Sequence, residues 1–298
     1  MRAAASLCSI LLLLGTLQGN EVMPSSQGKS VALLTTPNHN PFIGIWNAAF
    51  KATAEKAGMK VTNLTTPYDA ALQAQQVDDA MARRFDLIVL LPTSHQAIIP
   101  TLIRARNTGV PIVLIVSPIQ GYEDLYLSFI GPDHYELGRL AGENLAKALH
   151  SKGRKGGKVA AITGSSEQLS TQLRIAGFKT AIKAHSDIEI VAVEDGKWNT
   201  ALSERIAAQL LVRFAVRGGL DGIYGMADNQ AAGIIQAIEA ARMKPGLSPE
   251  EIVVVGSNCM AEGIRNIRAG KQYSTNTQLP TENGKAAAQH IIRYFNGE

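Results

Sequence analysis

The chain alternates two patterns of apolar residues. Short runs rich in β-branched residues predict buried strands, and longer stretches with apolar residues every three or four positions predict amphipathic helices. The run Ile112-Val113-Leu114-Ile115 is apolar on both faces, as a central strand of a parallel sheet requires. The predicted strands are Ser30–Thr35, Lys60–Thr65, Leu87–Leu91, Pro111–Val116, Leu127–Gly131, Lys158–Thr163, Ile188–Glu194, Gly222–Gly225 and Ile252–Val255. The predicted helices are Gly44–Ala57, Asp69–Arg84, Gln96–Thr108, Tyr135–His150, Leu169–Ala184, Thr200–Arg217 and Asn229–Ala241.

The regular alternation of strand and helix predicts an α/β fold with parallel sheets. A single sheet would need about ten parallel strands, which is near the practical limit. The rhythm also restarts after the Gly156-Gly157 turn. We therefore expect two Rossmann-like lobes, each a parallel sheet flanked by helices, joined by a hinge. The N-terminal lobe is assigned to residues 30–131 plus 279–298, and the C-terminal lobe to residues 132–278.

The N-terminus differs in kind from the rest of the chain. Met1-Arg2 supplies a positive start, and Leu7–Leu17 is almost continuously apolar but, at about 11 residues, too short to cross a bilayer that needs about 20. Residues 1–19 are therefore predicted to be a secretory signal peptide, followed by a flexible leader over residues 20–29. We expect an exported, periplasmic protein. Only Cys259 would remain after cleavage, so no intrachain disulfide is expected.

Composition narrows the class of partner. The 298 residues are 46% hydrophobic and 18% charged, which suits a large folded core. The net charge of +4 is spread along the sequence, and its densest cluster, Lys152-Gly153-Arg154-Lys155, contains no aromatic residue that could stack on a base. We interpret the cluster as a solvated turn and expect no nucleic-acid partner.

Polar residues follow most of the predicted strands. In parallel α/β sheets the carboxyl ends of strands form the ligand crevice, so two facing sheets would bring these loops together. The sequence offers no cluster with metal-ligand spacing, no Ser–His–Asp pattern and no phosphate loop. Binding is therefore favoured over catalysis, with no cofactor or metal. The polar residues concerned are Asn38, Asn40, Thr93, Ser94, Ser117, Ser165, Glu167, Trp198, Asn199, Asp228, Asn229, Asn258 and Gln278.

Each candidate also has a structural explanation. Asn40 could simply cap the first helix with Phe42 in the core, and Asp228 could cap a later helix. Arg174 could be a surface cation, and Trp198 could cover the edge of a lobe. The residues alone leave these alternatives open.

Several motifs together resemble one family. They are Asn40-Pro41-Phe42, Leu91-Pro92-Thr93, Phe129-Ile130-Gly131-Pro132-Asp133 followed by Gly138, Arg174-Ile175-Ala176-Gly177-Phe178, Trp198-Asn199, Asp228-Asn229, Val255-Gly256-Ser257-Asn258 and Gln278-Leu279-Pro280. Their order and spacing, from about Ser30 to Phe295, resemble the periplasmic substrate-binding proteins of carbohydrate ABC transporters, specifically the ribose-binding-protein-like group of type I. The resemblance implies that the lobes close on a ligand and present a surface to a membrane permease, with the protein acting as a monomer that reaches the membrane only through the permease.

The resemblance also implies roles for individual residues. Asn40 and Phe42 would bond to and stack on the ligand from the near lobe, and Trp198 would face it from the far lobe. Arg174 would donate to ligand oxygens, Gln278 would lie at the hinge, and Asp228 lies in a loop that supplies a polar contact in the family.

The chain departs from the ribose-binding pattern in ways that bear on the ligand. Ribose binders carry Asp where this chain has Ser117 and Asn258, Asn where it has Leu91, and a second aromatic where it has Ile43. Losing two carboxylates and an amide removes strong acceptors for vicinal hydroxyls, which argues against a standard pentopyranose or hexopyranose. A deoxy sugar, a polyol or a smaller oxygenated ligand remains open. The family also usually continues past the last helix with a strand that returns to the far lobe. This chain stops at Glu298, so either the sequence is truncated or one hinge crossing is missing.

Three other functions are alternatives to transport. A periplasmic sensor that signals to a receptor or histidine kinase has the same fold and differs in its partner. A repressor would need a helix-turn-helix before the first strand, where the signal-like segment lies instead. A hydrolase or nucleosidase would need a nucleophile or a carboxylate base in the cleft.

Overall fold

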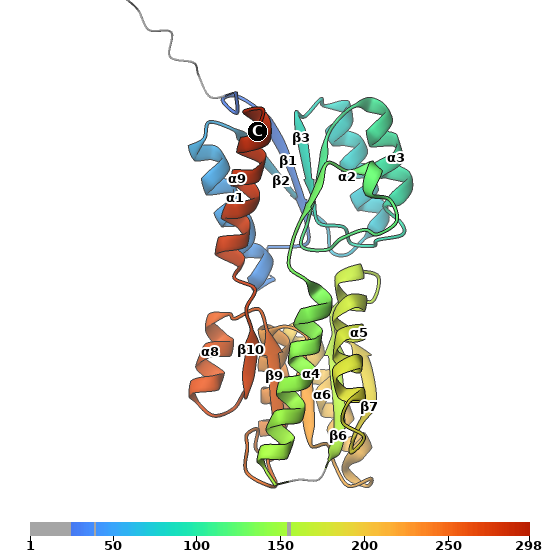
Figure 1. Ribbon diagram of the computed structural model, residues 1–298, viewed down its shortest axis with the longest axis vertical. Coiled ribbons are helices and arrows are strands. Elements are labelled where there is room, and N and C mark those ends of the chain that lie inside the picture. The colour runs from blue at the N-terminus through green and yellow to red at the C-terminus, as the bar shows by residue number, and fades with distance from the viewer. Residues whose placement is uncertain (1–24, 39, 154–155) are drawn as a thin grey trace, which may run out of the picture.

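The computed structural model describes residues 25–298 except 39, 154 and 155, and Figure 1 shows two α/β lobes stacked along the long axis. The predicted signal peptide and residues 20–24 lie outside the described residues. The first sheet has the strand order β2-β1-β3-β4-β5 and the second the order β10-β9-β8-β6-β7, and every pairing is parallel. The fold class predicted from the sequence is confirmed.

The first sheet is covered on both faces by helices. Its strands are β1 (Ser30–Thr35), β2 (Lys60–Thr65), β3 (Leu87–Leu90), β4 (Ile112–Ile115) and β5 (Ser128–Ile130). Its helices are α1 (Pro41–Lys56), α2 (Ala70–Ala82), α3 (Ile99–Thr108) and α9 (Pro280–Phe295), with the short 3-10 helix η1 (Glu123–Leu125) before β5.

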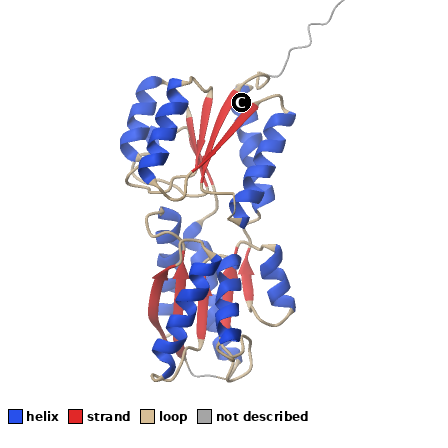
Figure 2. Ribbon diagram, turned by 180° about the vertical axis from the view of Figure 1, so that it is seen from behind, coloured by secondary structure: helices blue, strands red, loops and turns tan. Residues whose placement is uncertain are grey.

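The apolar runs of this sheet divide between two cores because successive side chains of a strand point to opposite faces. Val31 and Leu33 pack with Trp46 of α1 and Ile291 of α9. Their neighbours Ala32 and Leu34 pack instead with residues of α2 and α3. Figure 2 shows these two helix layers on either side of the sheet.

The second lobe repeats this construction. Its strands are β6 (Gly157–Thr163), β7 (Ile188–Asp195), β8 (Gly222–Gly225), β9 (Val253–Ser257) and β10 (Ser274–Asn276). Its helices are α4 (His134–Ser151), α5 (Leu169–Lys183), α6 (Thr200–Ala215), α7 (Asp228–Ala240) and α8 (Ala261–Arg268). One core lies under α4 and α5 and the other under α6 and α7.

The observed elements differ from the predicted ones at their ends. Helix α1 begins at Pro41 rather than Gly44, because Asn40 caps it and Pro41 suits the first helical position. The predicted elements did not include α8, β10 or α9. Helix α8 is only eight residues long and buries only Gly263, and β10 is three polar residues long, so neither gives a long apolar pattern.

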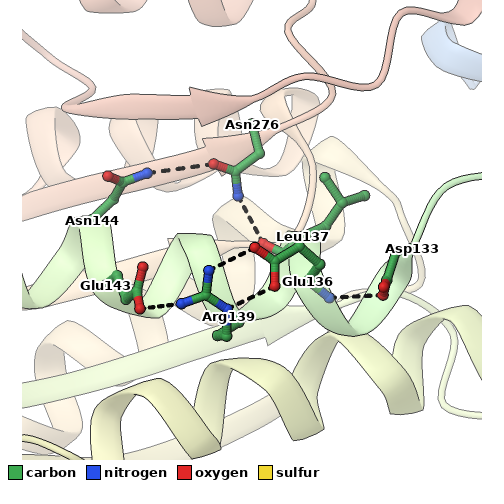
Figure 3. A network of polar contacts seen from close by, with 7 residues as sticks. All are labelled: Asp133, Glu136, Leu137, Arg139, Glu143, Asn144 and Asn276. Atoms are coloured by element: carbon green, nitrogen blue, oxygen red, sulfur yellow. Dashed lines mark hydrogen bonds and ion pairs between the residues drawn. The ribbon is translucent and has the colours of Figure 1, made fainter.

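The chain passes from the first lobe to the second after β5 and returns after β10. The start of α4, which follows the first crossing, lies beside the end of β10, which precedes the second (Figure 3). Asp133 caps α4 by accepting a hydrogen bond from the backbone N–H of Glu136 at 2.9 Å. Asn276, at the end of β10, donates to the carbonyl of Leu137 at 2.7 Å. Arg139 pairs with Glu136 and Glu143 along the same helix. The start of α4 is therefore bonded to the segment that leads back to the first lobe.

Residues 25–29, which the sequence assigned to a flexible leader, form a turn against the end of α1. The N–H of Gly28 donates to the carbonyl of Gly58 at 2.8 Å, and Ser26 Oγ donates to the carbonyl of Ala57 at 3.2 Å. Within the described residues no helix is both long and apolar enough to span a membrane.

Candidate ligand-binding site

The carboxyl ends of the two sheets face each other (Figure 1). Polar residues that follow the strands line a cleft between them. They enclose a cavity of about 40 Å³. Both lobes contribute. The lining residues are Thr36, Asn40, Phe42, Ile43, Tyr68, Leu91, Val116, His134, Gln168, Ser170, Arg174, Trp198, Ala227, Asn229, Asn258 and Gln278.

The wall from the first lobe combines an amide with aromatic rings. Asn40 Oδ1 accepts hydrogen bonds from the backbone N–H groups of Phe42 at 3.0 Å and Ile43 at 3.2 Å, so the capping role is confirmed while Asn40 also lines the cavity. Phe42 is 6% exposed and belongs to the core as well as to the cavity wall. Burial raises the pKa of the neighbouring Tyr68 to about 12, so its hydroxyl stays protonated at neutral pH.

Arg174 is the polar centre of the second lobe's wall. It is only 2% exposed, which excludes the surface-cation alternative. Its Nη1 donates to the carbonyl of Met226 at 2.9 Å and to Oδ1 of Asn258 at 3.3 Å. Its Nη2 donates to Oε1 of Gln278, and its Nε donates to Nδ1 of His134 at 3.1 Å. Burial lowers the pKa of Arg174, yet a guanidinium keeps its proton in proteins.

The position of Arg174 depends on close packing of α4 against α5. A Cβ at Gly138 of α4 would collide with the carbonyl of Arg174, and a Cβ at Gly177 of α5 would collide with the carbonyl of Tyr135. The two helices approach closely because both positions lack a side chain. The start of α5 is thus held beside the start of α4, where His134 lies.

His134 connects Arg174 to the first lobe. Its Nδ1 accepts from Arg174, and its Nε2 is bonded to the carbonyl of Val116 at the end of β4. Since a carbonyl can only accept, Nε2 carries the proton and the ring is neutral. Burial, reinforced by the charge of Arg174, lowers the pKa of His134 to about 3.

Trp198 is fixed by its surroundings. Its indole Nε1 donates to Oε1 of Gln168 at 2.6 Å, and its ring fills the space where Gly164 lacks a side chain. The Arg174 guanidinium carbon lies 5.4 Å from the ring centre, which is close enough for a cation–π interaction. The indole therefore covers Arg174 and lines the cavity, and does more than cover the lobe edge.

Four residues of the cavity wall have a positive φ angle: Tyr68 (58°), Val116 (61°), Trp198 (56°) and Asn258 (98°). This conformation is unfavourable for residues other than glycine, and for β-branched Val116 above all. Such strained positions concentrate at functional sites because the surrounding structure must hold them in place.

Two residues predicted to contact the ligand do not line this cavity. Ser117 Oγ accepts from the backbone N–H of Ser170 at 3.3 Å, a bond between the lobes.

Both oxygens of Asp228 accept hydrogen bonds from groups behind the cavity. Oδ2 accepts from the backbone N–H of Met260 at 2.7 Å and from Thr275 Oγ1 at 2.9 Å. Oδ1 accepts from Gln272 Nε2 at 2.9 Å. Burial raises the pKa of Asp228 to about 6. Asp228 fastens α7 to the β9–α8 loop and β10.

Further hydrogen bonds join the lobes around the cavity. Gln168 Nε2 donates to the carbonyl of Pro92 at 2.9 Å. The backbone N–H of His95 donates to the carbonyl of Glu167 at 3.1 Å. The structure is thus closed over the cavity. A wider groove of about 490 Å³ shares Asn40, Tyr68, Trp198 and Asn229 with it and leads outward.

The sequence did not identify Tyr68, His134 or Gln168 as site residues. Tyr68 follows β2, whose loop carried no motif, and His134 and Gln168 stand at helix starts, where polar residues are common. The only available signal was their position after a strand or at a lobe crossing.

His150, His185 and Asp187 come together at the opposite end of the second lobe. Their ligand atoms lie within 4.8 Å of one another, so this group could hold a metal ion. Sequence spacing did not reveal it because the three residues come from the end of α4 and the α5–β7 loop.

Two facing parallel sheets with a cavity between them are the architecture of the two-lobed periplasmic binding proteins. The model of the periplasmic binding protein domain matches residues 31–298, and the chain belongs to this family. The ribose-binding-protein-like resemblance is confirmed by the ribose import binding protein RbsB of Haemophilus influenzae, which is 23% identical over 299 residues covering 100% of this chain and 95% of that protein.

Solved structures agree on the fold. A galactofuranose binding protein superposes with a TM-score of 0.83 at 20% identity, covering 91% of this chain and 89% of that one. The fructose binding periplasmic domain of a hybrid two component system reaches 0.80 at 23% identity, covering 91% and 86%. At these identities the likeness concerns the fold alone.

Proposed function

We propose that this protein is an extracytoplasmic solute-binding protein that captures a sugar or sugar-like ligand, such as a polyol or a deoxy sugar, and delivers it to an ABC transporter permease. The observation that carries the proposal is the enclosed cavity, which has an aromatic residue from each lobe and several planar polar groups. Aromatic faces suit the C–H side of a sugar, and amides and guanidinium suit its oxygens. The related ribose import binding protein supports the ligand class, and the periplasmic binding protein family supports the location.

The ligand contacts in this proposal come from six of the predicted residues. Asn40 and Phe42 act from the first lobe, and Arg174, Trp198 and Asn258 act from the second, with Gln278 beside the second crossing. Ser117 and Asp228 support the site without touching the ligand. The lobe boundaries are proposed to fall after residue 131 and after residue 278.

Closure provides the mechanism. A ligand that contacts both lobes binds the closed state more tightly than the open one and shifts the population toward it by that difference. The bonds from Gln168 to Pro92 and from Ser170 to Ser117 exist only when the lobes meet. The permease would recognise the closed, loaded form, and no bond is made or broken in the ligand.

A sensor role is the second candidate, because the fructose binding domain of a two component system shares this fold. The two roles differ only in the partner of the closed form. Affinity capture with the ligand-loaded protein separates them: a permease supports transport, and a histidine kinase or receptor supports sensing.

The ligand-binding proposal is tested by thermal unfolding with a library of sugars and polyols. A true ligand raises the unfolding temperature, and above Kd the stabilisation grows with the logarithm of the ligand concentration. The two tryptophans allow a second readout, because Trp46 is buried in the first core and Trp198 lines the cavity. In a Trp46→Phe variant the remaining fluorescence should change on binding. If no member of the library stabilises the protein, transport of this class of ligand is rejected.

A further inference from the structure

The cavity between the lobes carries a single formal charge. Arg174 is the only Asp, Glu, Lys or Arg among its described lining residues, and His134 is neutral. Arg174 forms no ion pair with any described residue. The carboxylate that acts on it through space is Asp228, whose oxygens already accept three hydrogen bonds from Met260, Gln272 and Thr275. The guanidinium is thus buried without a partner of opposite charge in contact.

A buried charge normally has a counter-ion because leaving water is costly. The protein provides Arg174 with neutral acceptors only: two side-chain amides, one carbonyl and one imidazole nitrogen. These satisfy four of its five N–H groups and none of its charge. The remaining N–H belongs to Nη2, the atom that also bonds Gln278.

Gln278 adds a second unused donor at the same place. It is 3% exposed, and its Nε2 has no partner among the described residues. Because its Oε1 accepts from Nη2 of Arg174, its amide N–H groups lie next to that guanidinium. Two neighbouring donors, one of them cationic, are therefore left unpaired in the closed cavity.

Around Arg174 and Gln278, by contrast, the side-chain acceptors are already in use, while the hydroxyl of Thr36 on the opposite wall has no partner among the described residues. The side-chain oxygens of Gln168, Asn258 and Gln278 accept from Trp198 and Arg174, and that of Asn40 accepts from the backbone. A ligand that matches Arg174 and Gln278 must bring acceptors and negative charge.

We propose that the ligand is an acidic sugar derivative, an aldonate, a uronate or a shorter hydroxy acid, whose carboxylate binds Arg174 and Gln278. Its one negative charge matches the one positive charge of the cavity, and its two oxygens match the two neighbouring donors. The hydroxyl groups face Asn40 and the aromatic rings. This inference rests on the proposed solute-binding function and narrows its ligand class.

The test compares acids with neutral molecules of the same carbon skeleton by calorimetry and thermal unfolding. The pairs are D-galacturonate and D-galactose, D-gluconate and D-glucitol, and D-glycerate and glycerol. We expect at least one acid to bind about tenfold or more tighter than its neutral counterpart, because a charge-assisted bond replaces a neutral one.

The site is located with a nearly isosteric variant. Asn258→Asp places a carboxylate against Nη1 of Arg174, which neutralises the guanidinium and repels an acid; Asp also tolerates the left-handed conformation at this position. It should weaken acid binding by about a hundredfold. Asn107→Asp adds the same charge on the exposed face of α3 and should leave binding unchanged.

The outcomes separate the two proposals. If a neutral member binds as tightly as its acid, the acidic ligand is rejected and the solute-binding function stands. If acids bind but Asn258→Asp has no effect, the assignment of the carboxylate to Arg174 is rejected. If neither set nor the wider sugar library binds, the solute-binding function itself is rejected.

Discussion

At the scale of the residue, the chain from Val116 through His134 to Arg174 holds the site together. The ring of His134 accepts a hydrogen bond from Arg174 and donates one to the carbonyl of Val116. Only a neutral imidazole, with one acceptor and one donor nitrogen, can make both bonds. Protonation would remove the acceptor for Arg174 and place a second cation beside it. The low pKa of His134, about 3, follows from burial and from that neighbouring charge.

This low pKa predicts acid sensitivity. The share of stability that His134 contributes is complete above its unfolded pKa near 6.5 and is lost as pH falls from 6.5 toward 3. Between pH 7.5 and 5 the loss is about 2 kcal/mol. Asp228, whose pKa is raised to about 6, acts in the opposite direction because its ionised form is the disfavoured one. The effect of His134 must therefore be measured as a difference between variants.

Urea unfolding at the two pH values makes this measurement. A His134→Gln variant should be less stable at pH 7.5 but should lose about 2 kcal/mol less than the natural chain on going to pH 5. His290, a half-buried residue that contacts Ser128 in the first lobe, serves as the control, and its Gln variant should keep the natural pH dependence. Equal losses in all three proteins would contradict a neutral His134.

At the scale of the element, the crossing of α4 and α5 sets the position of Arg174. Gly138 and Gly177 allow the two helices to approach closely, and both helices begin at the cleft. Most of the other predicted elements could be placed from their apolar spacing alone. This close crossing could not, because a glycine in a helical stretch does not identify the helix it will face.

Gly138→Ala tests the crossing. The added methyl group meets the backbone of Arg174, which cannot rotate away, so we expect a loss of about 2 kcal/mol in stability. The displaced guanidinium should also weaken ligand binding by about tenfold or more. Lys147→Ala, on the exposed side of the same helix, should change neither quantity. Normal stability and affinity in Gly138→Ala would show that α5 is not positioned by this contact.

At the scale of the whole molecule, the two lobes are joined by few bonds. Gln168 is central among them because it donates to Pro92 across the cleft and accepts from Trp198 within its own lobe. The closed state therefore rests on side chains that can separate without disturbing either core. Such a balance suits a molecule that opens and closes around a ligand.

Gln168→Ala should shift the balance toward the open state. Without ligand, small-angle X-ray scattering should report a larger radius of gyration than for the natural chain, and saturating ligand should restore the closed value. Affinity should fall about fivefold to tenfold, because a smaller fraction of molecules is competent to bind. Gln172→Ala removes a bond within one lobe, to the carbonyl of Ser166, and should leave the scattering unchanged. Identical profiles for all three proteins would contradict closure at this interface.

The sequence by itself determined the two lobes, the order of their elements and six of the residues that line the cavity. These follow from local properties: the spacing of apolar residues defines a strand or a helix, and the loops after parallel strands must meet at one edge of a sheet. Tertiary structure decided that Asp228 turns away from the cavity, that Ser117 bonds across the cleft, and that Tyr68, His134 and Gln168 complete its wall. Direction of a side chain, burial and pairing depend on partners that are distant in sequence. The unpaired charge of Arg174 became visible only once every group around it had a position.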